Sequence, residues 1–410
     1  MSFAAGLEIC GKHKDVIVVE FNDGSYFKDI KVTIRKEMIE NYEQICNIKI
    51  GSSVAIDAFV RICREEPNFF LDVSNCVLIG NSNLDYPLKE RAKLFLEDYR
   101  KVPHLRPRTN TFAAIFKIRS MLYNKINDFF FKRGFTYINI PTNSSLKKQG
   151  KTSYASNLAI QCFSMAFSNV YSFGPLSKNK IQENNDIAYD ALVVESEMEF
   201  CNLEVDIFIA EELVKESICY ILKECTEELE YLSQICNYSL IDRLTWICDT
   251  EFVKIDYSDF FKILYKNQEL FEHKLKWGDS LEKEHIVYLT NSVYKKPTFI
   301  LNSPRSSDSF YIKQNGDKTE KAFKLYIPDF GEMMEGSQRE ANTLVLKSQM
   351  ENSRLNLKDY EWYLDARKYG SSEHSGLKLE LENLLMYITG INNIQDVIPF
   401  PNRLNKILDD

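Results

Sequence analysis

Three glutamates alternate along one short stretch of the chain, at Glu195, Glu197 and Glu199. Side chains of a β-strand point alternately to its two faces, so a strand here places the three carboxylates on one face. Arg339 and His374 follow later, each close to glycine and small polar residues. Carboxylates beside an arginine bind charged groups strongly, which suits a small-molecule pocket. The alternative is an internal polar network of the fold, since such a set is costly to break one partner at a time.

The elements that must position these residues are predicted from apolar periodicity. A long helix is expected between Asn110, a capping residue, and Gly134. Its apolar stripe is wide enough to contact a partner as well as its own core. The stripe consists of Phe112, Ile115, Phe116, Leu122, Ile126, Phe129 and Phe130. A second helix is expected at residues 206–224, and strands are expected at 135–140, 193–200, 298–301, 310–313 and 323–327.

The first 80 residues have a different pattern. Residues 16–21 form a β-rich apolar run, residues 22–25 have turn chemistry, and residues 54–60 resume the strand pattern. Short strands with one helical stretch predict a small β-barrel of OB type at 1–80. A linker rich in turn residues follows at 81–108, and a second domain of α+β class is expected at 109–410.

Composition limits the possible partners. The 410 residues, 44% of them hydrophobic, are ample for buried cores. The net charge of −8 does not favour DNA binding. Residues 100–135 carry nine Lys or Arg and one acid. This basic segment is either a surface that faces solvent or a dimer partner, or a surface that contacts nucleic acid. No long apolar run suggests a membrane span, and the ten scattered cysteines are expected to be reduced packing residues of a cytoplasmic protein.

Eight ordered segments together resemble the bacterial-type asparaginyl-tRNA synthetase family over nearly the whole chain. The segments are 22–25 (NDGS), 85–88 (DYPL), 104–111 (HLRPRTNT), 170–175 (VYSFGP), 195–198 (ESEM), 336–340 (GSQRE), 362–370 (WYLDARKYG) and 396–401 (DVIPFP). The resemblance implies an anticodon-binding OB domain followed by a class II catalytic domain on an antiparallel sheet. It also implies a reaction in which asparagine and ATP form an adenylate before acyl transfer to tRNA. It further implies a homodimer that forms through the helix from Phe112 to Phe130 and the strand around Pro141.

The resemblance implies an amino-acid site and an ATP site. The amino-acid site matches Gln161, Glu195, Glu197, Arg339 and His374, with Lys368 in place of an arginine. The ATP site departs from the family pattern: Lys replaces the α-phosphate arginine, Asn replaces the γ-phosphate arginine, and an alanine replaces the phenylalanine that stacks on adenine. The altered positions are Lys178, Lys180, Asp186, Ala191, Lys378, Glu380 and Asn383. Each lost charge-assisted contact is worth roughly 1.5–3 kcal/mol, so ordinary ATP use is not expected.

Three other family features are altered. Glu332 matches a magnesium ligand, but Lys324 replaces its acidic partner, so no metal and no other cofactor is expected. Val18 and Lys31 replace the anticodon-reading pair, so tRNA recognition is in doubt. The loop that closes over the amino acid is shortened to residues 142–150.

Three functional hypotheses follow. The first is a diverged paralogue that binds or acts on an asparagine- or aspartate-like amino acid in small-molecule metabolism, without standard tRNA charging. The second is a non-catalytic regulatory or scaffold dimer. The third is an atypical but active asparagine-tRNA ligase in which Lys178, Lys180, Lys324 and Lys378 rebuild a phosphate site, and it alone requires ATP and magnesium.

Overall fold

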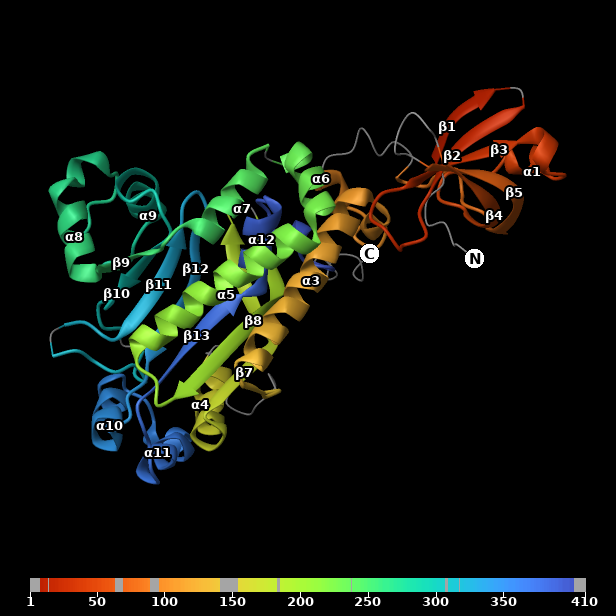
Figure 1. Cartoon of the computed structure of the whole chain (residues 1–410). Helices are drawn as coiled ribbons and strands as arrows, with labels where there is room; N and C mark the ends of the chain where they lie inside the picture. Colours follow the sequence, from red (N-terminus) through yellow and green to blue (C-terminus); the bar gives the residue numbers. More distant parts are fainter. Residues whose placement is uncertain are drawn as a thin grey trace. The chain divides into compact units, whose positions relative to one another are not determined.

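The computed structural model describes residues 8–13, 15–62, 69–88, 96–140, 154–182, 185–236, 238–306, 309–316 and 318–401 (Figure 1). The chain divides into two compact units. The first comprises residues 1–119, 227–232 and 395–401, and the second comprises 120–226, 233–394 and 402–410. None of the described helices is long and apolar enough to cross a membrane.

The first unit contains a five-stranded sheet in the order β1-β2-β3-β5-β4. Its strands are β1 (Glu8–His13), β2 (Val16–Phe21), β3 (Ile30–Arg35), β4 (Ser53–Ile62) and β5 (Phe69–Gly80), with the short helix α1 (Tyr42–Ile45) before β4. Alternate residues of β2 are buried, and Val32, Ile34 and Val54 are fully buried in the core. The expected N-terminal strand domain is therefore present, and the finer OB barrel assignment stays a prediction.

Cations of the basic segment lie inside the first unit. Arg100 donates to both oxygens of Asp396, at 2.9 and 2.6 Å. Arg106 is fully buried and donates to the carbonyl of Ile398. Burial lowers the pKa of Arg106 to about 10. The interpretation of Arg106 as a nucleic-acid contact is therefore wrong, because its side chain binds the C-terminal segment.

The second unit is built on an eight-stranded sheet in the order β6-β7-β8-β13-β12-β11-β10-β9. Its strands are β6 (Thr136–Tyr137), β7 (Asn169–Gln182), β8 (Asn185–Glu199), β9 (Val253–Asp256), β10 (Thr298–Leu301), β11 (Ala322–Ile327), β12 (Gly331–Gln338) and β13 (His374–Glu380). The six strands from β7 to β10 pair antiparallel, and the outer strands β6 and β9 join in parallel. The strand expected at 310–313 is wrong, since among these residues Ile312 alone pairs, in an isolated bridge with Arg339.

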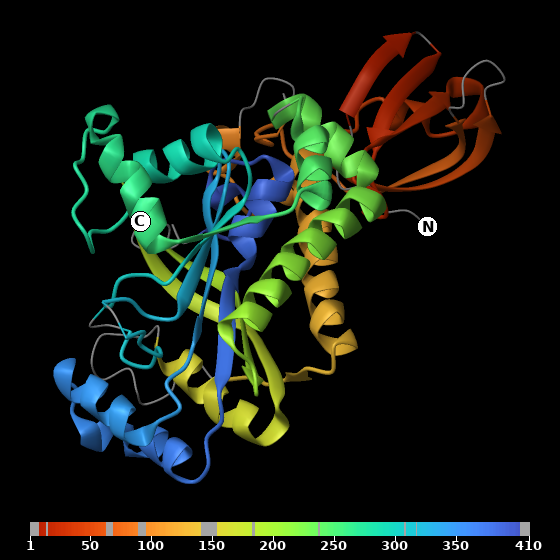
Figure 2. The same ribbon diagram turned by 60° about the vertical axis from the view of Figure 1, so that its left-hand side comes forward.

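Helix α5 lies across one face of this sheet in Figures 1 and 2. Asn202 caps α5 by accepting hydrogen bonds from the amides of Glu204 and Val205. The helices are α3 (Asn110–Lys132), α4 (Tyr154–Phe167), α5 (Leu203–Glu224), α6 (Thr226–Cys236), α7 (Leu240–Asp249), α8 (Tyr257–Lys266), α9 (Lys283–Val287), α10 (Thr343–Asn352), α11 (Glu361–Lys368) and α12 (Leu381–Thr389). α5 packs closely on β12, because a Cβ added at Gly336 would lie 2.9 Å from the Asp206 carboxylate.

The predicted stripe of α3 is used by the chain's own core. Six of its seven members are fully buried, and Phe116 is partly buried. Phe130 stacks on Tyr171 of β7, with ring centroids 4.8 Å apart. Lys125 and Arg133, two cations of the basic segment, both bond Glu216 of α5. The homodimer therefore stays a prediction that this stripe does not by itself support.

One cysteine pair departs from the expectation of reduced thiols. Cys219 of α5 forms a disulfide with Cys248 of α7, and their Cα atoms lie 6.0 Å apart. The sequence separation of 29 residues gave no signal of this contact. Other described cysteines, such as the buried Cys76 and Cys201, are free thiols, as expected.

Candidate functional site

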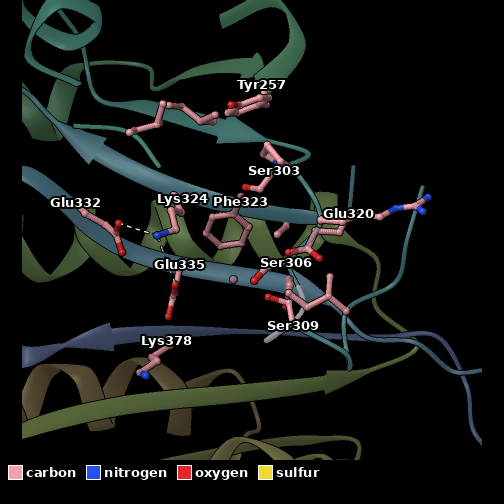
Figure 3. Close-up of a pocket in the computed structure, with 18 of the residues that line it drawn as sticks. Tyr257, Ser303, Ser306, Ser309, Glu320, Phe323, Lys324, Glu332, Glu335 and Lys378 are labelled. Carbon is pink, nitrogen blue, oxygen red and sulfur yellow. Dashed lines mark hydrogen bonds and ion pairs between the residues drawn. The ribbon is translucent and has the colours of Figure 1, made fainter. Parts of the chain in front are cut away.

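A cavity of about 540 Å³ lies over the open face of the second unit's sheet (Figure 3). Its floor comes from β11, β12 and β13, and its wall comes from residues 303–306, with Glu320 between them. Four cations line it: Arg305, Lys324, Arg339 and Lys378. Four carboxylates also line it: Asp279, Glu320, Glu332 and Glu335. The cavity can therefore bind a ligand that carries both positive and negative groups.

The central polar contact beside the cavity joins β8 to the end of β12. Arg339 Nε and Nη2 donate to Glu197, with the shortest contact 2.9 Å, and both side chains are almost completely buried. Gly376 makes the approach possible, since an added Cβ would lie 2.3 Å from a Glu197 oxygen. Burial favours the neutral carboxyl and raises the pKa of Glu197, although Arg339 opposes this shift. The pair fixes the guanidinium at the cavity wall.

A second buried network contains Gln161 and His374. Gln161 Oε1 accepts from Tyr363 and from Arg367 Nη2 of α11, and Arg367 also lies 3.0 Å from His374 Nε2. Tyr363 and Arg367 are four residues apart, which places both on the buried face of the helix. Lys368 does not join them. Its side chain is 62% exposed and lies 4.0 Å from Asp365.

The expected amino-acid residues thus fall into different environments. All six lie in the described part of the chain, and among them Arg339 alone lines the cavity. Gln161, Glu197 and His374 bond other protein groups, which favours the internal-network interpretation for them. Assignment of Lys368 to the pocket is wrong, because the next residue back, Arg367, occupies the buried position. The sequence analysis missed Arg367, although its spacing from Tyr363 was a usable signal.

A row of alternating charges crosses four strands below the cavity. Lys324 of β11 is in register with Glu335 of β12, Glu335 with Lys378 of β13, and Lys378 with Glu195 of β8. Neighbouring residues in such a row are close enough for opposite charges to attract. Glu195 is 6% exposed. The predicted shared face of Glu195, Glu197 and Glu199 is confirmed, since all three lie at alternate positions of β8.

A family model and known relatives match this chain over most of its length. The model of the family described as "tRNA synthetases class II (D, K and N)" matches residues 97–404. An asparagine–tRNA ligase of Acetivibrio thermocellus is 36% identical, with 95% of this chain and 91% of the relative covered. This chain belongs to the asparaginyl-tRNA synthetase family. A second asparagine–tRNA ligase, from Clostridium acetobutylicum, is 37% identical over 93% of this chain and 90% of the relative.

Solved structures agree with the class II synthetase fold. Asparaginyl-tRNA synthetase from Pyrococcus horikoshii complexed with asparaginyl-adenylate superimposes with a TM-score of 0.83. The alignment covers 98% of this chain and 93% of that one at 22% identity. Asparaginyl-tRNA synthetase from Entamoeba histolytica, in complex with the same adenylate, gives 0.83 at 20% identity and covers 98% and 94% of the two chains. At these identities the likeness shows the fold alone.

The seven positions expected to be altered in the ATP site lie on β7, β8, β13 and α12. Lys178, Lys180 and Asp186 belong to the β7–β8 hairpin, where Lys180 is in register with Ile187. The side chains of these three residues lie outside the described part of the chain. The shortened loop 142–150 also lies outside it. Ala191 is fully buried on β8. Lys378 lines the cavity, while Glu380 and Asn383 are partly buried on either side of the start of α12.

Glu320 is a cavity residue that the sequence analysis missed. It is 4% exposed, and burial raises its pKa to about 7. The backbone of Ser306 and the hydroxyl of Ser309 donate to it and oppose this shift, as does the charge of Arg305. Nothing in the local sequence marks it, because Ser306 and Ser309, which donate to it, lie more than ten residues earlier in the chain.

Substituting Glu320 with glutamine is expected to make the protein more stable than the parent above pH 7. The folded-state pKa of Glu320 is raised from 4.5 to about 7, so its favourable contribution is complete below pH 4.5 and is lost as pH rises through 7. The difference of 2.5 pKa units corresponds to about 3 kcal/mol. Urea unfolding of the variant and the parent at pH 5 and pH 8 measures the difference in their free energies of unfolding. An equal difference at the two pH values contradicts the prediction.

Proposed function

We propose that this chain is an atypical amino-acid-activating ligase of the asparaginyl type. It binds asparagine in the cavity and joins the carboxylate to the α-phosphate of ATP, with release of pyrophosphate. One observation carries the proposal: Lys324 and Lys378, which replace the family acid and glycine, line the same cavity as Arg339. Two of the four lysines of the third hypothesis thus add positive charge to the cavity, which supports the binding of an anionic ligand there.

The cavity's chemistry suits this substrate class. Asparagine carries an ammonium and a carboxylate, and the cavity offers cations and anions for both. Arg339 is held rigid by Glu197, so little entropy is lost when it faces a bound anion. The asparagine–tRNA ligase relatives, at 36–37% identity, support activation better than they support a role in small-molecule metabolism. The proposal includes a cytoplasmic homodimer. It does not include tRNA as the acceptor, because Val18 and Lys31 replace the anticodon-reading pair.

ATP–pyrophosphate exchange with each proteinogenic amino acid tests the proposal. Exchange that depends on asparagine is expected, slower than in an unaltered family member by at least about three decades, since several charge-assisted contacts are lost. The double substitution Glu197→Met with Arg339→Met, which leaves neither buried charge unpaired, is the control and is expected to lose the exchange. Absence of exchange with every amino acid contradicts the proposal.

A second candidate function is amino-acid binding without activation. Ala191 favours it, since a buried alanine offers no ring on which adenine can stack. Calorimetric titration distinguishes the two candidates. Heat on addition of asparagine or aspartate, combined with no exchange, supports the second candidate, and no heat with either ligand excludes both.

Restoring one arginine tests whether the loss of ATP contacts is distributed. Asn383→Arg is expected to change the exchange rate by less than about tenfold, because Lys178, Lys180, Asp186, Ala191 and Glu380 stay altered. The measurement is the exchange rate of the variant beside that of the parent. Recovery of a hundredfold or more would show that the deficit lies at this position alone.

A further inference from the structure

The Lys324 ammonium lies between two carboxylates of β12 (Figure 3). Its Nζ is 2.9 Å from Glu332 and 3.9 Å from Glu335. Glu332 is the position that the family resemblance assigns to magnesium, and Lys324 replaces its acidic partner. A lysine side chain thus holds a positive charge beside the carboxylate expected to bind the ion.

The residues present do not fit a magnesium ion. Magnesium requires oxygen ligands at about 2.0–2.1 Å in octahedral geometry. Glu332 is already bonded to Lys324 and to the Tyr326 phenol. Glu335 lies in register between Lys324 and Lys378, so two ammonium groups would repel a divalent cation there. Within the described residues, no group of three His, Cys, Asp or Glu side chains could hold a metal ion.

The ammonium is charged at neutral pH. Glu332 and Glu335 favour the charged form, because their oxygens lie 2.9 and 3.9 Å from Lys324 Nζ. Both carboxylates and Lys324 also line the cavity. The positive charge is therefore presented to whatever the cavity binds.

We infer that Lys324 is a tethered substitute for a divalent cation. Its ammonium fills the place between Glu332 and Glu335 and offers one positive charge to an anionic group of the ligand. With the proposed function that group is a phosphate, and this identification of the ligand rests on the proposed function. The exclusion of the metal does not rest on it.

Manganese binding to the full chain, followed by electron paramagnetic resonance without substrate, tests the inference. The parent is expected to bind no manganese that depends on Glu332, so Glu332→Ala leaves its titration unchanged. Lys324→Asp brings three carboxylates together and is expected to bind manganese at least about tenfold more tightly than the parent, the effect of one charge-assisted contact. In that background Glu332→Ala is expected to abolish the gain, and Lys378→Ala alone, the matched control, is expected to produce none.

Two results overturn the inference. One is manganese binding by the parent that weakens tenfold or more on Glu332→Ala. The other is a folded Lys324→Asp variant, with a cooperative thermal transition, that binds manganese no better than the parent. The manganese titration of the parent tests the inference even when the Lys324→Asp variant does not fold. The manganese test measures no turnover. A negative exchange assay would therefore contradict the proposed function without contradicting this inference.

Discussion

Replacing Glu197 with alanine is expected to lower the free energy of unfolding by about 3–5 kcal/mol, the usual cost of removing one partner of a buried ion pair. Arg339 is 4% exposed and would be left charged without its carboxylate. Its other contacts, with Ser337 and the Gly376 carbonyl, are neutral acceptors and do not compensate the charge. Urea unfolding of the variant at pH 7 measures the loss.

A matched control lies on the same sheet. Glu332→Ala removes an ion pair whose side chains are 40% and 42% exposed, so a loss of no more than about 1 kcal/mol is expected. The double substitution Glu197→Met with Arg339→Met tests the cause. It removes both charges and is expected to cost less than Glu197→Ala alone. Equal losses from Glu197→Ala and Glu332→Ala would show that burial does not set the cost.

Acidification is expected to destabilise the protein through His374. Its Nδ1 lies 2.8 Å from the Ser372 carbonyl and must donate, so Nε2 is the acceptor for Arg367. Protonation of Nε2 would remove that acceptor and add a charge beside Arg367. Burial, with the charge of Arg367, lowers the pKa of His374 to about 3. Neutral His374 makes its full contribution to the free energy of unfolding above pH 6.5. This contribution is lost as pH falls toward 3, by about 1.4 kcal/mol for each pH unit.

A His374→Gln variant isolates this effect. The glutamine amide can donate to Ser372 and accept from Arg367 but does not titrate. The parent is expected to lose stability relative to the variant by roughly 3 kcal/mol between pH 6.5 and pH 4.5. Urea unfolding of both proteins at these two values measures it. A constant difference between them would mean that His374 binds a proton equally well in the folded and unfolded states.

Motifs and periodicity determined the family, the class II fold and the main elements. The apolar spacing of α3 and the run from Ala322 to Ile327 predicted a buried helix and strand correctly, because burial on one face leaves a periodic trace in the sequence. The alternation of Glu195, Glu197 and Glu199 likewise predicted their shared face. Strand 310–313 was wrong, because Phe310 and Ile312 are buried by packing, although Ile312 makes no more than an isolated bridge.

Tertiary structure decided which polar residues meet. Lys324 replaces a metal ligand in the sequence, but only the register of β11 with β12 places its ammonium between Glu332 and Glu335. Arg367 and Lys368 are neighbours of similar charge, and the packing of α11 decides that the first is buried and the second exposed. Glu320 and the Cys219–Cys248 pair gave no local signal. Such contacts depend on distances between segments remote in sequence, which residue spacing along one segment does not encode.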